Sequence, residues 1–173
     1  SVILHEYAHG WVAYQFGDPT AKLAGRLTLN PLKHVDPVGT ILIPGILLTL
    51  SLLGKGTLMF GWAKPVPVNP YRLKGGAAAY RWVSAAGIIT NVILAVIAAV
   101  ILKIATFYFH LDASNLGVMF FSLVMQINLI LAIFNSLPFP GFDGFNFLTT
   151  FKPLAALVAK TPLANPMFMA QYG

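Results

Sequence analysis

Cysteine is absent from this 173-residue chain, and acidic side chains are scarce, with five Asp and Glu residues in total. The first absence excludes disulfides and thiolate ligands, so a bound metal would have to use nitrogen and oxygen donors. Charged residues of both signs make up 9% of the chain, whereas 57% is hydrophobic. A soluble domain of this length carries far more charge, so the composition predicts a membrane protein.

The net charge of +6 has two interpretations. A basic surface can bind nucleic acid, but in an apolar chain basic loops more often mark the orientation of membrane segments. We therefore expect a lipid bilayer, and no nucleic acid, as a partner.

Two apolar segments are long enough to cross a membrane. They cover residues 82–109 and 115–137, and each exceeds the roughly 20 residues that span the hydrocarbon. The linker around Asp112 is so short that the two helices must be antiparallel neighbours. Residues 1–16 look like the last part of a third span, which the Gly-Asp-Pro sequence at 17–19 would end.

The run HEYAHG places two histidines four residues apart, at His5 and His9, with Glu6 between them. On a helix this spacing puts both imidazoles on one face, where they can bind Zn²⁺. Glu6 would then lie beside the metal-bound water as a candidate general base for hydrolysis. The pattern also occurs by chance in unrelated proteins, so its context has to decide.

A catalytic zinc needs a third protein ligand. Asp143 is the candidate, because it follows the second apolar segment in FNSLPFPGFDGF, where prolines and glycines break the helix. Irregular backbone at membrane depth is tolerated where it lines a hydrated site enclosed by protein. An Asp-Gly pair after prolines is also an ordinary interfacial turn, but HExxH in the same chain favours a ligand to a single zinc.

These two motifs resemble those of the site-2 protease family of intramembrane zinc metalloproteases. The family's second motif, approximately N-x-x-P-x-x-P-L-D-G, is matched here at Asn135, Pro138, Asp143 and Gly144. Positions 140 and 142 depart from its usual form. The loops GRLTLNPLKHVDPVGT and FGWAKPVPVNP are similar to the prokaryotic branch that lacks a large inserted domain.

The resemblance implies hydrolysis of a peptide bond in or near a transmembrane segment of a membrane-protein substrate. The substrate helix must unwind before its carbonyl can reach the site, so helix-weak residues near the cut should matter. Zinc would be held by His5, His9 and Asp143, with Glu6 as general base. By the same resemblance Asn135 could hold the substrate or stabilise the oxyanion.

The run AGIITN is similar to the family's small-residue stretch in the intervening helix, with Gly87 and Asn91 at the corresponding spacing. Asn91 is a second candidate for binding the substrate or the oxyanion. A hydrogen bond between neighbouring helices is the favoured interpretation of this residue.

The three ligands must meet at one depth in the bilayer. If residues 38–54 crossed the membrane, Asp143 would return on the face away from the histidines. We therefore expect this segment to enter and turn back at Pro44 and Gly45, and a short extended loop to follow at residues 64–70. One face then carries most of the basic residues, and the positive-inside rule makes it cytoplasmic. They are Lys22, Arg26, Lys33, Lys55, Lys64, Arg72, Lys74, Arg81, Lys152 and Lys160, which leaves Lys103 elsewhere.

Two loops have open interpretations. His34 and Asp36 could bind a second metal, but the Pro and Gly of HVDPVG indicate a turn that these residues stabilise. Residues 64–70, rich in proline, are either an edge against which an unwound substrate lies or a rigid surface loop.

We expect residues 1–173 to form one all-α, multi-pass peptidase core in the plasma membrane, with three transmembrane helices and the active site towards the cytoplasm. The chain begins with Ser1 and enters the HExxH motif without a lead-in helix, so we expect a fragment that lacks flanking helices at both ends. The alternatives are a non-catalytic membrane scaffold, which the intact Glu6 argues against, and another class of membrane zinc protease, with a glutamate as third ligand. No residue selects a substrate or an oligomeric state.

Overall fold

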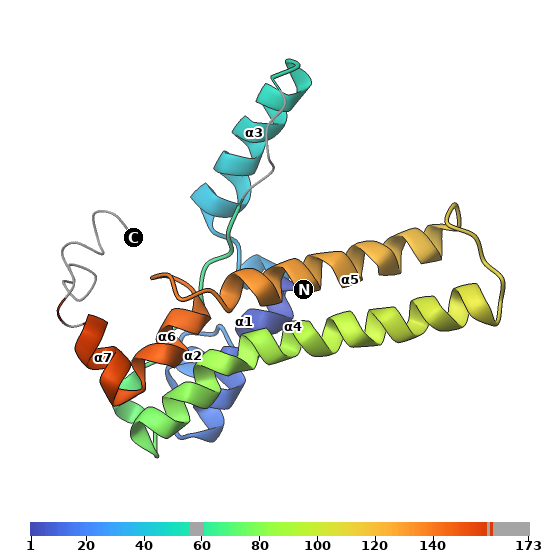
Figure 1. The fold of residues 1–173 in the computed structure, drawn as a ribbon. Helices are drawn as coiled ribbons and strands as arrows, with labels where there is room; N and C mark the ends of the chain where they lie inside the picture. The colour runs from blue at the N-terminus through green and yellow to red at the C-terminus, as the bar shows by residue number, and fades with distance from the viewer. Residues whose placement is uncertain (56–60, 159, 161–173) are drawn as a thin grey trace.

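The computed structural model describes residues 1–55, 61–158 and 160, and the regular structure in them is helical, with no strand (Figure 1). The 64–70 segment of the sequence prediction is an extended connection without a β-ladder. The helices are α1 (Val2–Gln15), α2 (Thr20–Leu23), η1 (Pro31–Lys33), η2 (Pro37–Leu42), α3 (Ile43–Leu52), η3 (Pro70–Arg72), α4 (Gly76–Phe107), α5 (Leu116–Asn135), α6 (Asp143–Thr149) and α7 (Lys152–Val158).

The two longest helices, α4 and α5, form the predicted antiparallel hairpin (Figure 1). Asn115 begins α5 by accepting hydrogen bonds from the N–H groups of Gly117 and Val118. Both helices are long and apolar enough to cross a membrane. In the most apolar 18-residue stretch of each helix, only 28% is buried in α4 and 17% in α5. Their apolar surface is therefore largely left without a protein cover.

Helix α1 packs against α4 and ends at the predicted place. Gly17 has a φ of +92°, a conformation that suits glycine at the end of a helix. With 14 residues, α1 is shorter than a full span. The core of three transmembrane helices therefore remains a prediction.

The buried Asp18 carboxylate fixes the connection that follows α1. One of its oxygens accepts hydrogen bonds from the N–H group and hydroxyl of Thr20, and the other accepts from the N–H group of Asn69 at 2.6 Å. Next to it, the N–H group of Lys74 donates to the carbonyl of Phe16 at 2.7 Å. The end of α1 and the start of α4 are thereby held together.

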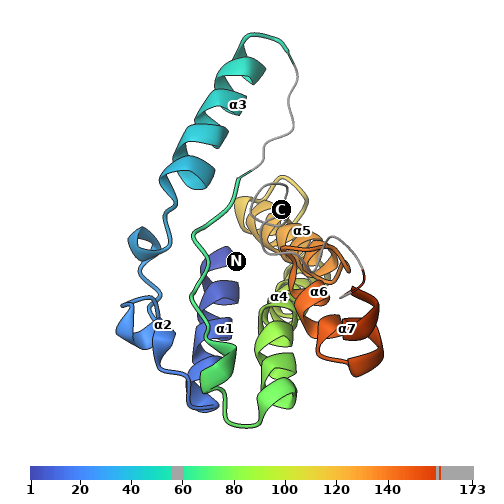
Figure 2. The same ribbon diagram turned by 90° about the vertical axis from the view of Figure 1, so that its left-hand side faces the viewer.

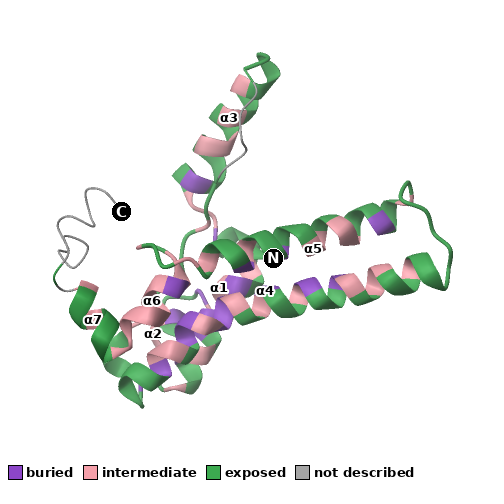
Figure 3. Ribbon diagram, viewed as in Figure 1, coloured by how far each residue is buried: buried purple, intermediate pink, exposed green. Residues whose placement is uncertain are grey.

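Small side chains fill the core between α1 and α4. Ala13, Leu73, Ala79 and Val83 form its buried apolar cluster, and small residues allow two helices to approach closely. Figure 3 shows that the buried positions gather where these helices meet. The same contact places one face of α1 against the N-terminal half of α4.

Helices η2 and α3 form one continuous apolar arm, which projects from the rest of the molecule (Figures 1 and 2). The predicted turn at Pro44 and Gly45 is wrong, because the backbone stays helical from Pro37 to Leu52 and Pro44 lies just after η2 passes into α3. The chain turns instead beyond Leu52, at Gly54, whose φ is +74°. Lys55 follows this turn, and the membrane face on which it lies remains a prediction.

The arm leaves and returns to the body at one place. Asp36 caps its first turn by accepting hydrogen bonds from the N–H groups of Val38 and Gly39. On return, the N–H group of Trp62 donates to the carbonyl of Gly39 at 3.1 Å, and the Thr40 hydroxyl donates to the carbonyl of Trp62 at 2.8 Å. A Cβ atom at Gly39 would overlap the indole ring of Trp62, so glycine is required there.

Candidate metal centre

Three predicted ligands converge on one point. Nε2 of His5 and Nε2 of His9 lie 3.1 Å apart, and Oδ2 of Asp143 lies 3.2 Å and 3.1 Å from them, respectively. Both histidines are buried. Within the described residues, this is the one group of three or more His, Cys, Asp or Glu residues with a geometry that could hold a metal.

The donor set fits zinc. Two imidazole nitrogens and one carboxylate oxygen are typical of a catalytic zinc site, and donors about 2.1 Å from a tetrahedral ion lie roughly 3.4 Å from one another. The Nδ1–H group of His9 donates to the carbonyl of Val83 at 2.7 Å, so a neutral His9 ring has its lone pair on Nε2. That lone pair points at a second imidazole nitrogen and a carboxylate oxygen, an arrangement that a cation between them would stabilise.

Gly87 lets helix α4 approach both histidines. A Cβ atom at this position would overlap Cε1 of His5 and Nε2 of His9. One turn further along α4, Nδ2 of Asn91 lies 3.1 Å from Nδ1 of His5. Asn91 is fully buried, and its Oδ1 has no hydrogen-bond partner in the part of the chain that the structure describes.

Asp143 reaches the centre through a tight chain reversal. After α5 ends at Asn135, an irregular stretch leads into α6, of which Asp143 is the first residue. A Cβ atom at Gly144 would overlap the carbonyl group of Ser136. Glycine at position 144 is therefore what allows α6 to begin directly beside the end of α5.

Glu6 is held by the segment that returns from the arm. Its Oε2 accepts a hydrogen bond of 2.8 Å from the N–H group of Val66, which is 8% exposed. The Val66 side chain packs on Gly10, where a Cβ atom would lie 2.9 Å from Cγ1 of Val66. The extended segment therefore lies directly on the face of α1 that carries the candidate base.

Comparison with known proteins agrees with this donor set. The chain is 46% identical over 156 residues to "Putative zinc metalloprotease YwhC" of Bacillus subtilis. The aligned region covers 88% of this chain and 66% of YwhC. It is 29% identical over 158 residues to "Putative zinc metalloprotease Rip2" of Mycolicibacterium smegmatis. That aligned region covers 86% of this chain and 52% of Rip2. The Rip2 protein of Mycobacterium tuberculosis is 28% identical over 148 residues, with 84% of this chain and 51% of Rip2 covered.

The chain is homologous to proteins named as zinc metalloproteases. It spans less than two thirds of YwhC and about half of the Rip2 proteins. No family model matches it. No solved structure matches it either.

The other predicted site residues lie outside the three-ligand group. Asn135 uses its Nδ2 to donate to the carbonyl of Leu131 in its own helix, at 2.9 Å. His34 contacts the carbonyl of Thr28 through Nε2 at 2.8 Å, and Asp36 caps the arm. Neither of the last two belongs to a metal-binding group among the described residues, and both contacts agree with a role in stabilising the loop.

Two residues that shape this candidate metal centre could not be predicted from their side chains. Val83 and Val66 act through a backbone carbonyl and a backbone N–H, so their side chains carry no chemical signal. A weak signal exists for each of them. Val83 lies one helical turn before Gly87, and Val66 is the residue with an N–H group between Pro65 and Pro67.

Proposed function

We propose that the chain is the catalytic core of an intramembrane zinc metalloprotease of the site-2 protease type. Its reaction would be hydrolysis of a peptide bond in or near a transmembrane segment of a membrane protein. The observation that carries this proposal is the convergence of His5, His9 and Asp143 within 3.2 Å, with Glu6 on the same helix as both histidines. The relatives named as zinc metalloproteases support it.

The proposed setting is a plasma membrane that α4 and α5 cross, with α1 completing the core. The exposed apolar surface of α4 and α5 would then face lipid. Basic residues flank the end of α4 that carries the metal centre, among them Lys74 and Arg81, and the positive-inside rule makes this end cytoplasmic. Lys103 lies near the other end, where a long side chain can reach the interface.

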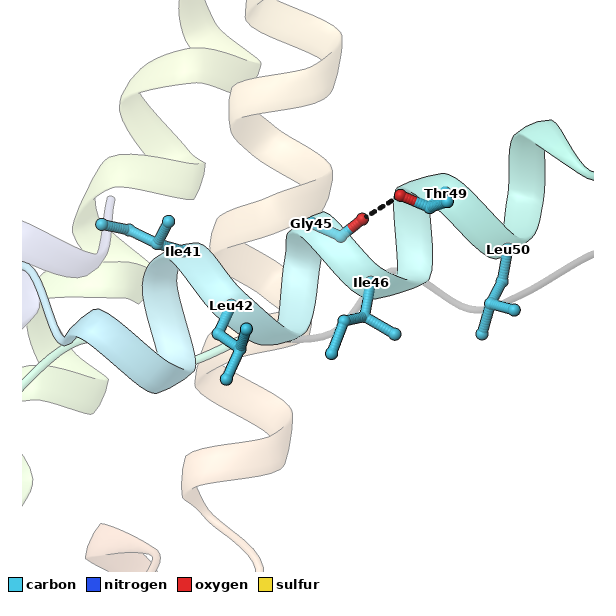
Figure 4. Close-up of a pocket in the computed structure, with 6 residues that line it drawn as sticks. All are labelled: Ile41, Leu42, Gly45, Ile46, Thr49 and Leu50. Atoms are coloured by element: carbon cyan, nitrogen blue, oxygen red, sulfur yellow. Dashed lines mark hydrogen bonds between the residues drawn. The ribbon is translucent and has the colours of Figure 1, made fainter.

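The arm is proposed to be a re-entrant element within the bilayer. Figure 4 shows Ile41, Leu42, Ile46 and Leu50 along it, and the hydroxyl of Thr49 turned back to the carbonyl of Gly45 at 2.8 Å. That hydrogen bond satisfies a polar group that would otherwise meet hydrocarbon. Departure and return at the Gly39–Trp62 contact also agree with an element that enters and leaves on one side.

Zinc held by His5, His9 and Asp143 would supply a Lewis acid that polarises the scissile carbonyl and lowers the pKa of a water molecule. Glu6 would take the proton from that water and later deliver it to the leaving nitrogen. Oε2 of Glu6 is bound by the N–H group of Val66. Oε1 is the oxygen left for this transfer, because no hydrogen bond to Oε1 is found within the described residues. The N–H group of Val66 therefore orients the base.

The proposed substrate is a membrane-spanning helix. Each carbonyl in such a helix is hydrogen-bonded, so the segment must unwind before the reaction, and glycine or proline near the cut lowers that cost. The extended 64–70 segment would help bind the unwound chain. Its prolines at 65 and 67 have no N–H groups, so at these positions it could only accept hydrogen bonds.

The decisive experiment is elemental analysis of zinc in the detergent-purified chain, with Asp143→Ala and His34→Ala as a matched pair. We expect about one zinc in the unaltered chain and in His34→Ala, and loss of zinc in Asp143→Ala. Zinc retained by Asp143→Ala, or lost only on changing His34, would contradict the ligand assignment. Cleavage of a single-span test protein with a Gly-Pro pair in its membrane segment would separate a protease from a zinc-binding scaffold.

A further inference from the structure

We infer that Asn91 is a positioning residue whose amide oxygen accepts a hydrogen bond from the Nδ1–H group of His5 and thereby fixes this ring for metal binding. The inference rests on the proposed zinc site. It assigns Asn91 a role in the affinity of that site rather than in binding substrate or the oxyanion.

Metal binding requires a particular arrangement of protons on the two histidines. Nε2 of His5 and Nε2 of His9 are the atoms that converge with Asp143, so both need free lone pairs when a metal is held. Each Nδ1 must then carry hydrogen, and a buried N–H group needs an acceptor. His9 has this acceptor in the carbonyl of Val83, at 2.7 Å.

For His5 the group in this position is the side-chain amide of Asn91, 3.1 Å from Nδ1. An amide offers an acceptor on one side and a donor on the other, and its two ends are nearly the same size. In the structure Nδ2 faces His5, which suits a ring with hydrogen on Nε2 and a lone pair on Nδ1. A metal-binding ring has the opposite arrangement and requires Oδ1.

The amide is free to make this exchange. Its oxygen has no hydrogen-bond partner in the described parts of the chain, and the contact with His5 is the hydrogen bond of its nitrogen. A half-turn of the amide therefore breaks no other hydrogen bond found for this side chain. The two orientations correspond to the two tautomers of His5, and metal binding selects the one with oxygen towards the ring.

The location of Asn91 supports a role in positioning. Val83, Gly87 and Asn91 are spaced by four residues along α4, so they form one stripe that faces the histidines. Asn91 is fully buried beside His5, so water cannot readily replace its oxygen. A substrate carbonyl could reach the amide only if this contact were broken.

The test compares three variants of the detergent-purified chain. Asn91→Leu removes the acceptor, and Asn91→Asp keeps an oxygen acceptor. Asn128→Leu is the matched control, because Asn128 is also a fully buried helical asparagine with an unpartnered Oδ1, but donates to Ser1 and Val124 instead. The readouts are zinc affinity, by competition with a chromophoric chelator, and the thermal unfolding of each metal-free chain.

We expect zinc affinity to fall roughly 10- to 100-fold in Asn91→Leu and to stay within a few-fold of the unaltered chain in Asn91→Asp and Asn128→Leu. Unchanged affinity in Asn91→Leu would overturn the inference. So would an equal loss in Asn91→Asp, or an equal loss in Asn128→Leu. If Asn91→Leu does not fold, Asn91→Asp still decides, because a role in packing alone predicts that a buried carboxylate weakens the site. Absence of zinc from the unaltered chain would instead overturn the proposed function, and this inference with it.

Discussion

The backbone N–H group of Val66 donates a 2.8 Å hydrogen bond to the carboxylate of Glu6, 60 positions earlier in the chain. The two partners belong to different parts of the fold, since Glu6 lies on α1 and Val66 on the segment that returns from the arm. Orientation of the candidate base therefore depends on a segment that carries no ligand.

Val66→Pro should remove this hydrogen bond, in a segment whose neighbouring residues are already prolines, together with the contact that the buried Val66 side chain makes on Gly10. A hydrogen bond to a charged group contributes about 1.5–3 kcal/mol, so we expect cleavage to slow roughly ten-fold or more while zinc content stays the same. The control is Val68→Pro, because no hydrogen bond of the Val68 N–H group is found in the described segments. Equal effects of the two substitutions on cleavage of the single-span test protein would contradict the role of Val66.

Glu6→Gln should separate binding from chemistry. The substitution keeps the size of the side chain but removes the group that takes the proton, and general base catalysis contributes about 10²- to 10⁴-fold. We expect cleavage to fall by a factor of that order, with zinc content and unfolding temperature unchanged. Retained cleavage would remove Glu6 from the mechanism.

Gly87→Ala should weaken the metal centre, because the new methyl group would overlap the imidazoles of His5 and His9. We expect less than half of the zinc content of the unaltered chain and a lower unfolding temperature, by the amount that overpacking of about 1–3 kcal/mol produces. Gly45→Ala in α3 is the control, since nothing lies within 4 Å of a Cβ atom there. A Gly87→Ala chain with full zinc content would show that α4 is free to move away.

Asp18 should make the protein sensitive to acid. Burial alone would raise the pKa of this carboxyl, but hydrogen bonds from Thr20 and Asn69 outweigh it and hold the pKa below its ordinary value of 3.8. A carboxyl with a lowered pKa in the folded state stabilises the fold above its unfolded pKa, and this contribution is lost as the pH falls through the folded pKa. We expect the unfolding temperature in detergent to drop below about pH 4.

Two variants test the source of this acid sensitivity. Asp18→Asn should lower the unfolding temperature at neutral pH and reduce its decrease in acid. Asp112→Asn should have little effect on either quantity, because Asp112 is exposed, although hydrogen bonds from Ser114 also lower its pKa. The same acid response in Asp18→Asn and in the unaltered chain would assign the sensitivity to other groups.

The absence of cysteine makes a topology experiment direct, because no native thiol has to be removed. Lys74→Cys lies just before α4, and Ala113→Cys lies in the connection between α4 and α5. In intact cells we expect a membrane-impermeant maleimide to label position 113, and to label position 74 only after permeabilisation. Labelling of position 74 from outside would reverse the proposed orientation, and labelling of both positions would exclude a span between them.

Local spacing explains what the sequence could predict. The four-residue spacing of His5 and His9 places both side chains on one face of a helix. The apolar lengths of α4 and α5 predict a hairpin. Asp143 could be predicted as a ligand only by combining the HExxH motif with the distant FNSLPFPGFDGF stretch. The turn at Pro44 was predicted wrongly because this proline lies at the junction of two helical segments and does not end the helical run. Hydrogen bonds made by backbone groups, such as those of Val66 and Val83, depend on tertiary packing and leave no mark in the residue type.

The length of α4 sets the depth of the chemistry. At about 1.5 Å per residue, Gly87, which touches both histidines, lies roughly 30 Å along the helix from Phe107, about the full thickness of the hydrocarbon. In the proposed orientation the centre thus sits at the inner boundary of the bilayer and not at its midplane. A thicker bilayer would draw it away from water, and a thinner one would expose it. Acyl-chain length is therefore a physical means by which the lipid itself could tune hydrolysis, and reconstitution in lipids of graded chain length would measure that effect.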